Sequence, residues 1–272
     1  MIDAITQKLH RFRALSADDT AALRKLAHGV QSHSPHDDVI RIGSKPEFAL
    51  AILSGWAIRY VVLKNGSRQI TAFLLPGDFC HLNMFSEAPM DHSIAALSPV
   101  TAAHIKREEV EHILGEHSNI AKAVQASQFA DESRLRASIT NMGRQDARQR
   151  LGYMLCDLWT RANTVGLMKG DFLDFPPIQA DIADFVGLTS VHVNRIIQRL
   201  RGDGLLDLKE RCLRLPDFDR LAKASGYNAT ATGSDRNHST SAINGRASAS
   251  REMSSHTRRS NAEVGFLRPI GL

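Results

Sequence analysis

The stretch "IQADIADFVGLTSVHVNRIIQRL", residues 178–200, decides the fold of the C-terminal half of the chain. Its apolar residues follow the spacing of two helices, and Gly187 stands between them, where a tight turn needs a positive φ. Thr189 or Ser190 can cap the second helix. The pattern predicts a helix-turn-helix, and the simpler alternative is a two-helix packing unit with a solvated polar face.

The second helix of this pair divides into two faces. At about 100° per residue, one face is apolar and is expected to pack inward: Val193, Ile196, Ile197 and Leu200. The other face suits base edges in a DNA major groove, with Arg195 for guanine, Asn194 for adenine or thymine, and Val191 for a thymine methyl. Phosphate contacts, which position a protein without specifying sequence, are expected from His192, Arg199 and Arg201.

Elements on either side of the pair favour DNA binding over simple packing. "FLDF", residues 172–175, predicts a short strand that the following prolines stop. "LLDLKERCLRLP", residues 205–216, predicts a hairpin that carries the basic residues Lys209, Arg211 and Arg214. A strand before the pair and a basic hairpin after it predict a winged helix-turn-helix.

Residues 39–104 change to a strand-like pattern. Short runs of β-branched and aromatic residues alternate with turn segments, and Asn65-Gly66 is a strong hairpin signal. Many short strands of this kind predict a small antiparallel β-roll. Residues 1–28 are expected to be helical, with Ser16 and Asp19 marking a helix N-cap and Gly29 a stop.

Helices are expected between the roll and the winged segment. They are a short helix within residues 106–117, a long helix over residues 118–142, where no glycine or proline occurs, and an amphipathic helix over residues 145–162. The long helix has a sparse apolar stripe: Ile120, Val124, Leu135, Ile139 and Met142. A stripe too narrow for burial in a monomer predicts a coiled-coil dimer seam, and the alternative is a surface helix lying on the roll.

The segment from about residue 226 onward is rich in Ser, Ala, Asn, Gly, Thr and Arg. It cannot bury enough apolar surface to offset its ordering entropy, so we predict that it is disordered. Its six arginines against three acidic residues give a net charge of +3, more than half of the +5 of the chain. The bulk charge is therefore weak evidence for DNA binding by the rest of the chain.

"QADIADFVGLTSVHVNRIIQRLRGDGLL", residues 179–206, resembles the DNA-binding motif of the Crp/Fnr transcription regulators, and the order of elements over residues 5–221 is similar to that family. The resemblance implies an α+β fold with an N-terminal antiparallel β-roll like a cyclic-nucleotide-binding domain, a long dimerisation helix and a C-terminal winged helix-turn-helix. The corresponding domains are residues 1–117, 118–142 and 143–224, followed by a tail over residues 225–272.

The resemblance also implies partners. They are a second copy of the chain, double-stranded DNA with two symmetric half-sites about 34 Å apart, and RNA polymerase. By position, Ser190, Val191, Asn194 and Arg195 fall on the family's base-contact positions, and Gln179 and Thr189 join the phosphate contacts. Family members often have an acidic residue where this chain has Val191, so no operator sequence is carried over. A signal in the roll would rotate the recognition helices about the dimer helix.

The loop "PGDFCHLNMFSEAPMDHS", residues 76–93, is expected to determine what the roll senses. Cyclic-nucleotide binders of the family have a Gly-Glu pair for the ribose and an Arg-Ser/Thr pair for the phosphate, and these positions here read His81-Leu82 and Met90-Asp91. A carboxylate there would repel a phosphate, so cyclic AMP is not expected as the ligand. The oxygen-sensing branch has cysteines near its N-terminus, and this chain has none before Cys80, so we do not expect an iron–sulfur cluster.

Cys80, His81 and His92 form the one set in this loop that could respond to oxidation or bind a metal or haem. The alternative is a small buried cysteine with two surface histidines. We assign no cofactor and no metal site on these residues, while haem or a metal stays open.

The composition excludes several classes of protein. Hydrophobic residues make up 43% and charged residues 23%, as in ordinary globular proteins. Three cysteines spaced far apart, without a CxxC pair, favour a reducing cytoplasm over secretion. No apolar run approaches the ~18 residues of a membrane helix, and we find no nucleophile–base set or phosphate loop. We therefore expect neither a membrane protein nor an enzyme, and the remaining alternative is a cyclic-nucleotide-type module that regulates a partner protein.

Overall fold

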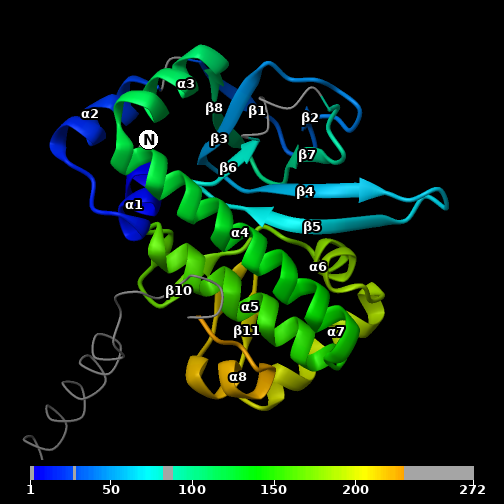
Figure 1. Ribbon diagram of the computed structural model, residues 1–272. Helices are drawn as coiled ribbons and strands as arrows, with labels where there is room; N and C mark the ends of the chain where they lie inside the picture. The colour runs from blue at the N-terminus through cyan, green and yellow to red at the C-terminus, as the bar shows by residue number, and fades with distance from the viewer. Residues whose placement is uncertain (1–2, 27–28, 82–87, 230–272) are drawn as a thin grey trace, which may run out of the picture. The chain divides into compact units, whose positions relative to one another are not determined.

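Two antiparallel sheets form the N-terminal β-roll, as predicted. The computed structural model describes residues 3–26, 29–81 and 88–229, and its two sheets have the strand orders β1-β8-β3-β6 and β2-β7-β4-β5 (Figure 1). The strands are β1 Val30–His33, β2 Asp38–Ile40, β3 Phe48–Ser54, β4 Ala57–Val62, β5 Arg68–Leu74, β6 Phe79–His81, β7 Ser93–Ala96 and β8 Val100–Lys106. The turn between β4 and β5 contains Gly66 with a φ of 84°, which confirms the hairpin predicted at Asn65-Gly66.

The roll begins earlier than the sequence pattern indicates. β1 starts at Val30, not at residue 39, and pairs with β8 from Val30↔Ala103 to His33↔Val100. The pattern also misses β6, which pairs with β3. The prediction that Gly29 stops a helix is wrong, because the helix before it ends at Lys25. A Cβ at Gly29 would lie 2.3 Å from the carbonyl oxygen of His104, so a glycine permits the close approach of the chain to β8.

Two short helices, α1 Asp3–Phe12 and α2 Ala17–Lys25, precede the roll. The predicted N-cap is confirmed: Ser16 Oγ accepts from the backbone N–H of Asp19, and the Asp19 carboxylate accepts from the N–H of Ser16. Apolar residues of α1 and α2 pack with β3 and β8 and with the start of the long helix. The buried members of this cluster include Ile5, Leu9, Leu23, Ala51, Ile105, Ile120 and Val124.

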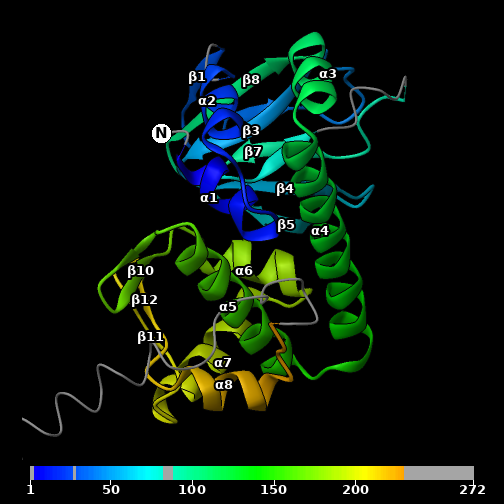
Figure 2. The ribbon, with the colours of Figure 1, turned by 60° about the vertical axis from the view of Figure 1, so that its left-hand side comes forward.

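Three helices connect the roll to the C-terminal segment: α3 Arg107–Glu116, α4 Ser118–Arg144 and α5 Ala147–Thr164. The 27 residues of α4 form one continuous helix (Figure 2). Its predicted apolar stripe is divided in the structure, because Ile120 and Val124 are buried against the roll and α1 and so do not belong to a seam. Leu135, Ile139 and Met142 remain 43–61% exposed, and Phe129, which the sequence analysis missed, is a further exposed apolar residue of α4.

The winged segment has the predicted elements with additions at both ends. Its sheet has the order β11-β12-β10-β9, built from β9 Met168–Lys169, β10 Phe172–Asp174, β11 Asp207–Lys209 and β12 Cys212–Arg214. A final helix, α8 Phe218–Ser225, ends at a left-handed Gly226, and the following Tyr227 is buried with its ring against Tyr153. The prediction of a tail from residue 225 is therefore wrong at its start, while residues 230–272 lie outside the described part.

One apolar core joins the second roll sheet to the winged segment. Trp56, Ile70 and Phe73 from the roll belong to the same buried cluster as Leu155 of α5. The ring of Trp56 meets Phe175 edge-on, with the two ring centroids 5.9 Å apart. Within the described ranges, no helix has the length and apolar character needed to cross a membrane.

Candidate DNA-binding surface

The helix-turn-helix consists of α6 Gln179–Val186 and α7 Ser190–Gly202. Gly187 ends α6 with a φ of 66°, and the backbone N–H of Leu188 donates to the carbonyl of Ala183 at 3.0 Å. The cap of α7 is Thr189, whose hydroxyl accepts from the backbone N–H of His192 at 3.2 Å. The turn thus has the positive φ and the side-chain cap that the sequence predicts.

The two predicted faces of α7 are present in the structure. The inward face is at most 3% exposed: Val193, Ile196, Ile197 and Leu200. On the opposite face Val191 is 63% exposed, and Ser190 and Arg195 are exposed as well. Val191 and Arg195 are four residues apart, so they lie one turn apart on this exposed face.

Asn194 is half-buried and is held in place by a neighbour. Its side-chain Nδ2 donates to Gln179 Oε1 at 3.2 Å, and Gln179 is the first residue of α6. The structure therefore brings together one predicted base-reading residue and one predicted phosphate-binding residue from the two helices. This contact fixes the direction in which the amide of Asn194 points.

The other predicted phosphate contacts are spread along α7. Thr189 and His192 are exposed at its N-terminal end, next to the predicted base-reading residues, and Arg199 is exposed one turn before the C-terminal end. Arg201 lies in the last turn, where its guanidinium is 3.9 Å from a carboxylate oxygen of Asp207 at the start of β11. Arg201 is thus set apart from the N-terminal end of α7 and close to the wing.

The wing is the predicted hairpin, formed by β11 and β12 with Leu208 paired to Leu213. Its two turn residues, Glu210 and Arg211, both have a positive φ, of 50° and 64°, and the carbonyl of Arg211 accepts from Phe175 N at 2.7 Å. Lys209 and Arg211 are exposed at the tip. Such a two-residue turn matches the twist of the hairpin and directs both basic side chains away from the core.

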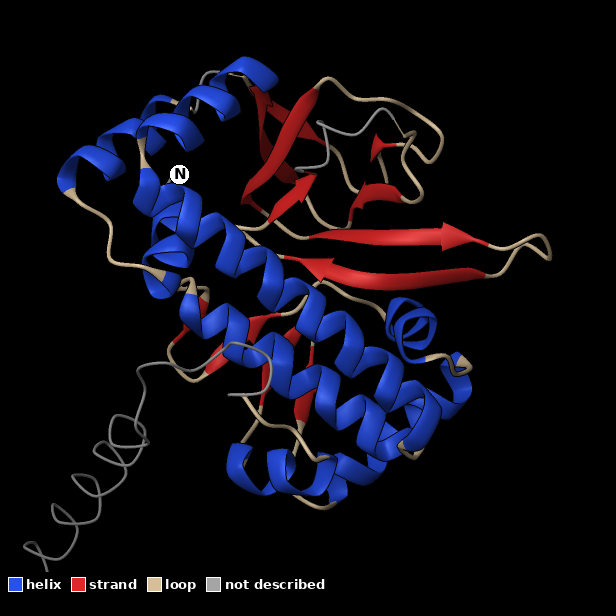
Figure 3. Ribbon diagram, in the orientation of Figure 1, coloured by secondary structure: helices blue, strands red, loops and turns tan. Residues whose placement is uncertain are grey.

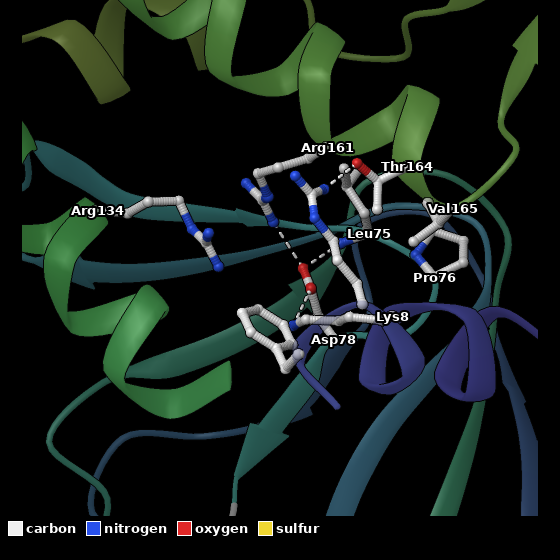
Figure 4. Close-up of a pocket in the computed structure, with 10 residues that line it drawn as sticks. Lys8, Leu75, Pro76, Asp78, Arg134, Arg161, Thr164 and Val165 are labelled. Atoms are coloured by element: carbon white, nitrogen blue, oxygen red, sulfur yellow. Dashed lines mark hydrogen bonds and ion pairs between the residues drawn. The ribbon is translucent and has the colours of Figure 1, made fainter. Parts of the chain in front are cut away.

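A buried ionic cluster joins the roll to α5. Asp78, in the turn between β5 and β6, accepts from Lys8 Nζ of α1 and from Arg161 of α5, each at 2.7 Å (Figure 4). Burial alone would raise the pKa of Asp78, but Lys8 and Arg161 outweigh it and hold that pKa well below its usual range. The pocket beside the cluster is also lined by Arg134, which pairs with Asp131. Since these cations are paired within the chain, the cluster connects α1, the roll and α5.

Comparisons with known proteins agree with this architecture. Residues 30–117 match the cyclic nucleotide-binding domain, and residues 149–224 match the Crp-like helix-turn-helix domain. The two matched ranges together cover more than half of the chain. The chain belongs to the Crp/Fnr family of transcription regulators.

Individual Crp/Fnr relatives are similar over most of the chain. The transcriptional activator protein FnrL of Cereibacter sphaeroides is 23% identical over 79% of this chain and 89% of its own length. The nitrogen fixation regulation protein FixK of Azorhizobium caulinodans is 30% identical over 60% of this chain and 64% of its own. The solved structure of FixK2 from Bradyrhizobium japonicum superposes with a TM-score of 0.63, at 24% identity, over 71% of this chain and 95% of its own. The family and the fold show that this protein is a DNA-binding transcription regulator with a cyclic-nucleotide-binding-like domain.

The region where Crp/Fnr cyclic-nucleotide binders hold their ligand contains the candidate effector residues. Cys80 is 3% exposed, and burial raises the pKa of its thiol to about 12, so it is a neutral thiol inside the roll core. His92 is half-buried, and its Nδ1 lies 2.5 Å from a carboxylate oxygen of Asp91. The side chain of His81 and all of Leu82 lie outside the described residues. In the part of the chain that the structure describes, no three His, Cys, Asp or Glu side chains are grouped as metal ligands.

Sequence reasoning missed one set of contacts made by the helix-turn-helix. Arg68, at the start of β5, pairs with Asp181 and Asp184 of α6. These partners lie 113 and 116 residues further along the chain, and no local pattern indicates that they meet. The Crp/Fnr roll and the helix-turn-helix of this chain are therefore linked by ion pairs as well as by the apolar core.

Proposed function

We propose that this regulator binds a palindromic operator as a homodimer and that Ser190, Val191, Asn194 and Arg195 read its bases. The observation that carries the proposal is the exposed face of α7, where Val191 and Arg195 project from a capped and internally packed helix. Phosphate contacts are assigned to Gln179, Thr189, His192 and Arg199 around this face, and to Arg201 toward the wing. Direct base contacts and phosphate contacts then come from one surface, as in other helix-turn-helix proteins.

The second half of α4 supports dimerisation. Leu135, Ile139 and Met142 leave an apolar stripe on a helix whose first half is packed against the roll. Apolar side chains at a spacing of three and four residues, such as 135, 139 and 142, form the seam of a two-helix coiled coil. A dimer of this kind would place two α7 helices on one face of the DNA, with half-sites about one helical turn apart.

The proposal also covers the regulatory role of the protein, its further partner and the task of each segment. FnrL is named a transcriptional activator, and we extend that role to this chain with RNA polymerase as its partner in the cytoplasm. In this proposal residues 1–117 sense a signal, residues 118–142 form the dimer contact and residues 143–224 bind DNA.

The test is selection of duplexes by the full-length protein, followed by measurement of affinity at several salt concentrations. We expect the selected sites to be palindromic and Arg195→Ala to weaken binding to them by about tenfold or more, as for the loss of a bidentate guanine contact worth about 1–3 kcal/mol. The matched control is Arg258→Ala in the C-terminal segment, which removes the same charge and should leave sequence preference unchanged. Equal losses from both changes would assign the binding to the basic segment and contradict the proposal.

A further inference from the structure

We propose that Arg68, on the roll, is a positioning residue for operator recognition. Arg68 is the first residue of β5. The β4–β5 hairpin lies beside α6 of the helix-turn-helix (Figure 3). The role of Arg68 is to hold the N-terminal turn of α6, and through it Gln179 and Asn194, in the geometry that reads DNA. The inference rests on the proposed assignment of Asn194 and Gln179 to the DNA contacts.

The guanidinium of Arg68 holds two carboxylates of one helix at once. Its Nε donates to Asp184 Oδ2 at 2.7 Å, and its NH2 group donates to Asp181 Oδ1 at 2.6 Å. The side chain of Asp181 is 7% exposed, whereas those of Arg68 and Asp184 are 32% and 30% exposed. A planar guanidinium that binds two fixed acceptors restrains direction as well as distance, which a single exposed pair does not.

Asp181 transmits this restraint to the start of α6. While one of its oxygens accepts from Arg68, the other accepts from the backbone N–H of Ile178, the N-cap residue of α6, at 3.0 Å. The next residue, Gln179, accepts the hydrogen bond from Asn194 Nδ2. A continuous series of contacts therefore leads from Arg68 through Asp181 and the first turn of α6 to a base-reading residue on α7.

Other contacts keep the hairpin on α6 without Arg68. Gln69 Nε2 donates to the carbonyl of Phe185 at 3.2 Å, and the rings of Phe73 and Phe185 lie 5.2 Å apart. Ile70 and Phe73 are buried in the core that the roll shares with the winged segment. Loss of Arg68 alone should therefore change the setting of the first turn of α6 and leave the fold in place.

Arg68 also has an electrostatic effect at this position. In a helix-turn-helix the first helix crosses the DNA backbone, so negative charge on α6 opposes the approach of phosphates. Arg68 balances part of the charge of Asp181 and Asp184. Because both the geometric and the electrostatic effect pass through these two aspartates, removing Asp184 should not improve recognition, although it removes a negative charge.

The experiment measures two affinities for each protein, one for the selected operator and one for a scrambled duplex of equal length, and takes their ratio. The full-length proteins compared with wild type are Arg68→Ala, Asp184→Ala and the double variant. We expect each single change to lower this ratio by about tenfold, within the 5–150-fold range of coupling between sites. The double variant should lose no more than either single variant, because the two residues act through one contact. Arg68→Lys, which keeps the charge without the planar fork, should recover only part of the ratio.

Arg41→Ala is the matched control, since it removes the same charge from an arginine whose side chain is 79% exposed on the roll. A urea midpoint for every variant separates a shift in recognition from loss of fold. If Arg68 instead contacted phosphate directly, Arg68→Ala would weaken both duplexes alike and Asp184→Ala would strengthen both. That result, or additive losses in the double variant, overturns the inference. If wild-type protein selects no palindrome, the proposed operator contacts fail first and the inference falls with them.

Discussion

Replacement of Asp78 should destabilise the protein more than the loss of an ordinary surface carboxylate. Asp78 is 5% exposed and accepts hydrogen bonds from Lys8 Nζ at 2.7 Å, Arg161 at 2.7 Å and the backbone N–H of Leu75 at 2.8 Å. The side chains of Lys8 and Arg161 are themselves only 8% and 14% exposed. Asp78→Ala leaves both cations buried without this partner, a change that typically costs about 3–5 kcal/mol.

Thermal unfolding followed by circular dichroism measures this loss. For an ordered region of about this size, 1 kcal/mol corresponds to roughly 2–4 °C, so Tm should fall by roughly 6–20 °C. The control is Asp18→Ala on α2, where the side chain is 87% exposed and the expected change is within about 0.5 kcal/mol.

A second variant tests the cause of the loss. If the unpaired cations destabilise Asp78→Ala, then adding Lys8→Met should restore part of the stability, because it removes one buried charge. The double variant would then be more stable than the sum of the two single changes predicts. Additive losses, or a Tm within 3 °C of wild type for Asp78→Ala, would refute the reasoning.

Three further predictions concern other parts of the chain. The backbone N–H of Ser16 lowers the pKa of Asp19 from 3.8 to about 2, so the stability that it contributes is complete above about pH 3.8 and is lost as the pH falls toward 2. Wild type should therefore lose more unfolding free energy between pH 5 and pH 3 than Asp19→Asn, and equal losses would contradict the assignment. Ile139→Asp should shift the protein toward monomer in sedimentation equilibrium, whereas Lys122→Asp, on the roll half of α4, should not; an unchanged dimer in Ile139→Asp would exclude the seam. At pH 8 a thiol reagent should modify the half-buried Cys212 before Cys80, as read by mass spectrometry of digests, and the reverse order would show that burial does not protect Cys80.

Elements with a strong periodic pattern were predictable from the sequence. The helix-turn-helix follows from the spacing of Val193, Ile196 and Leu200, because the buried face of a helix repeats every three to four residues. β1 has no such pattern: three of the four residues of "VQSH" are exposed, and the strand is stabilised by its hydrogen bonds to β8. A strand whose side chains are not buried leaves no alternation in the sequence.

The surroundings of α4 could not be predicted from α4 itself. Val124 and Ile139 are both apolar residues on its stripe, yet one is 7% exposed against the roll and the other is 61% exposed. Helical periodicity shows which residues share a face, but the neighbour that covers the face is set by segments far away in the chain. The same limit applies to the pairs of Arg68 with Asp181 and Asp184, because these partners lie 113 and 116 residues further along the chain.

The continuity of α4 has a mechanical consequence. At 1.5 Å per residue, its 27 residues span about 40 Å. If the helix behaves as a rigid rod fixed at its roll end, a tilt of about 5° displaces its other end by about 3.5 Å, more than half the 5.4 Å pitch of a helical turn. Because the helix is long, a displacement of a few tenths of an ångström around Ile120 and Val124 becomes several-fold larger at the end of α4 next to the winged segment.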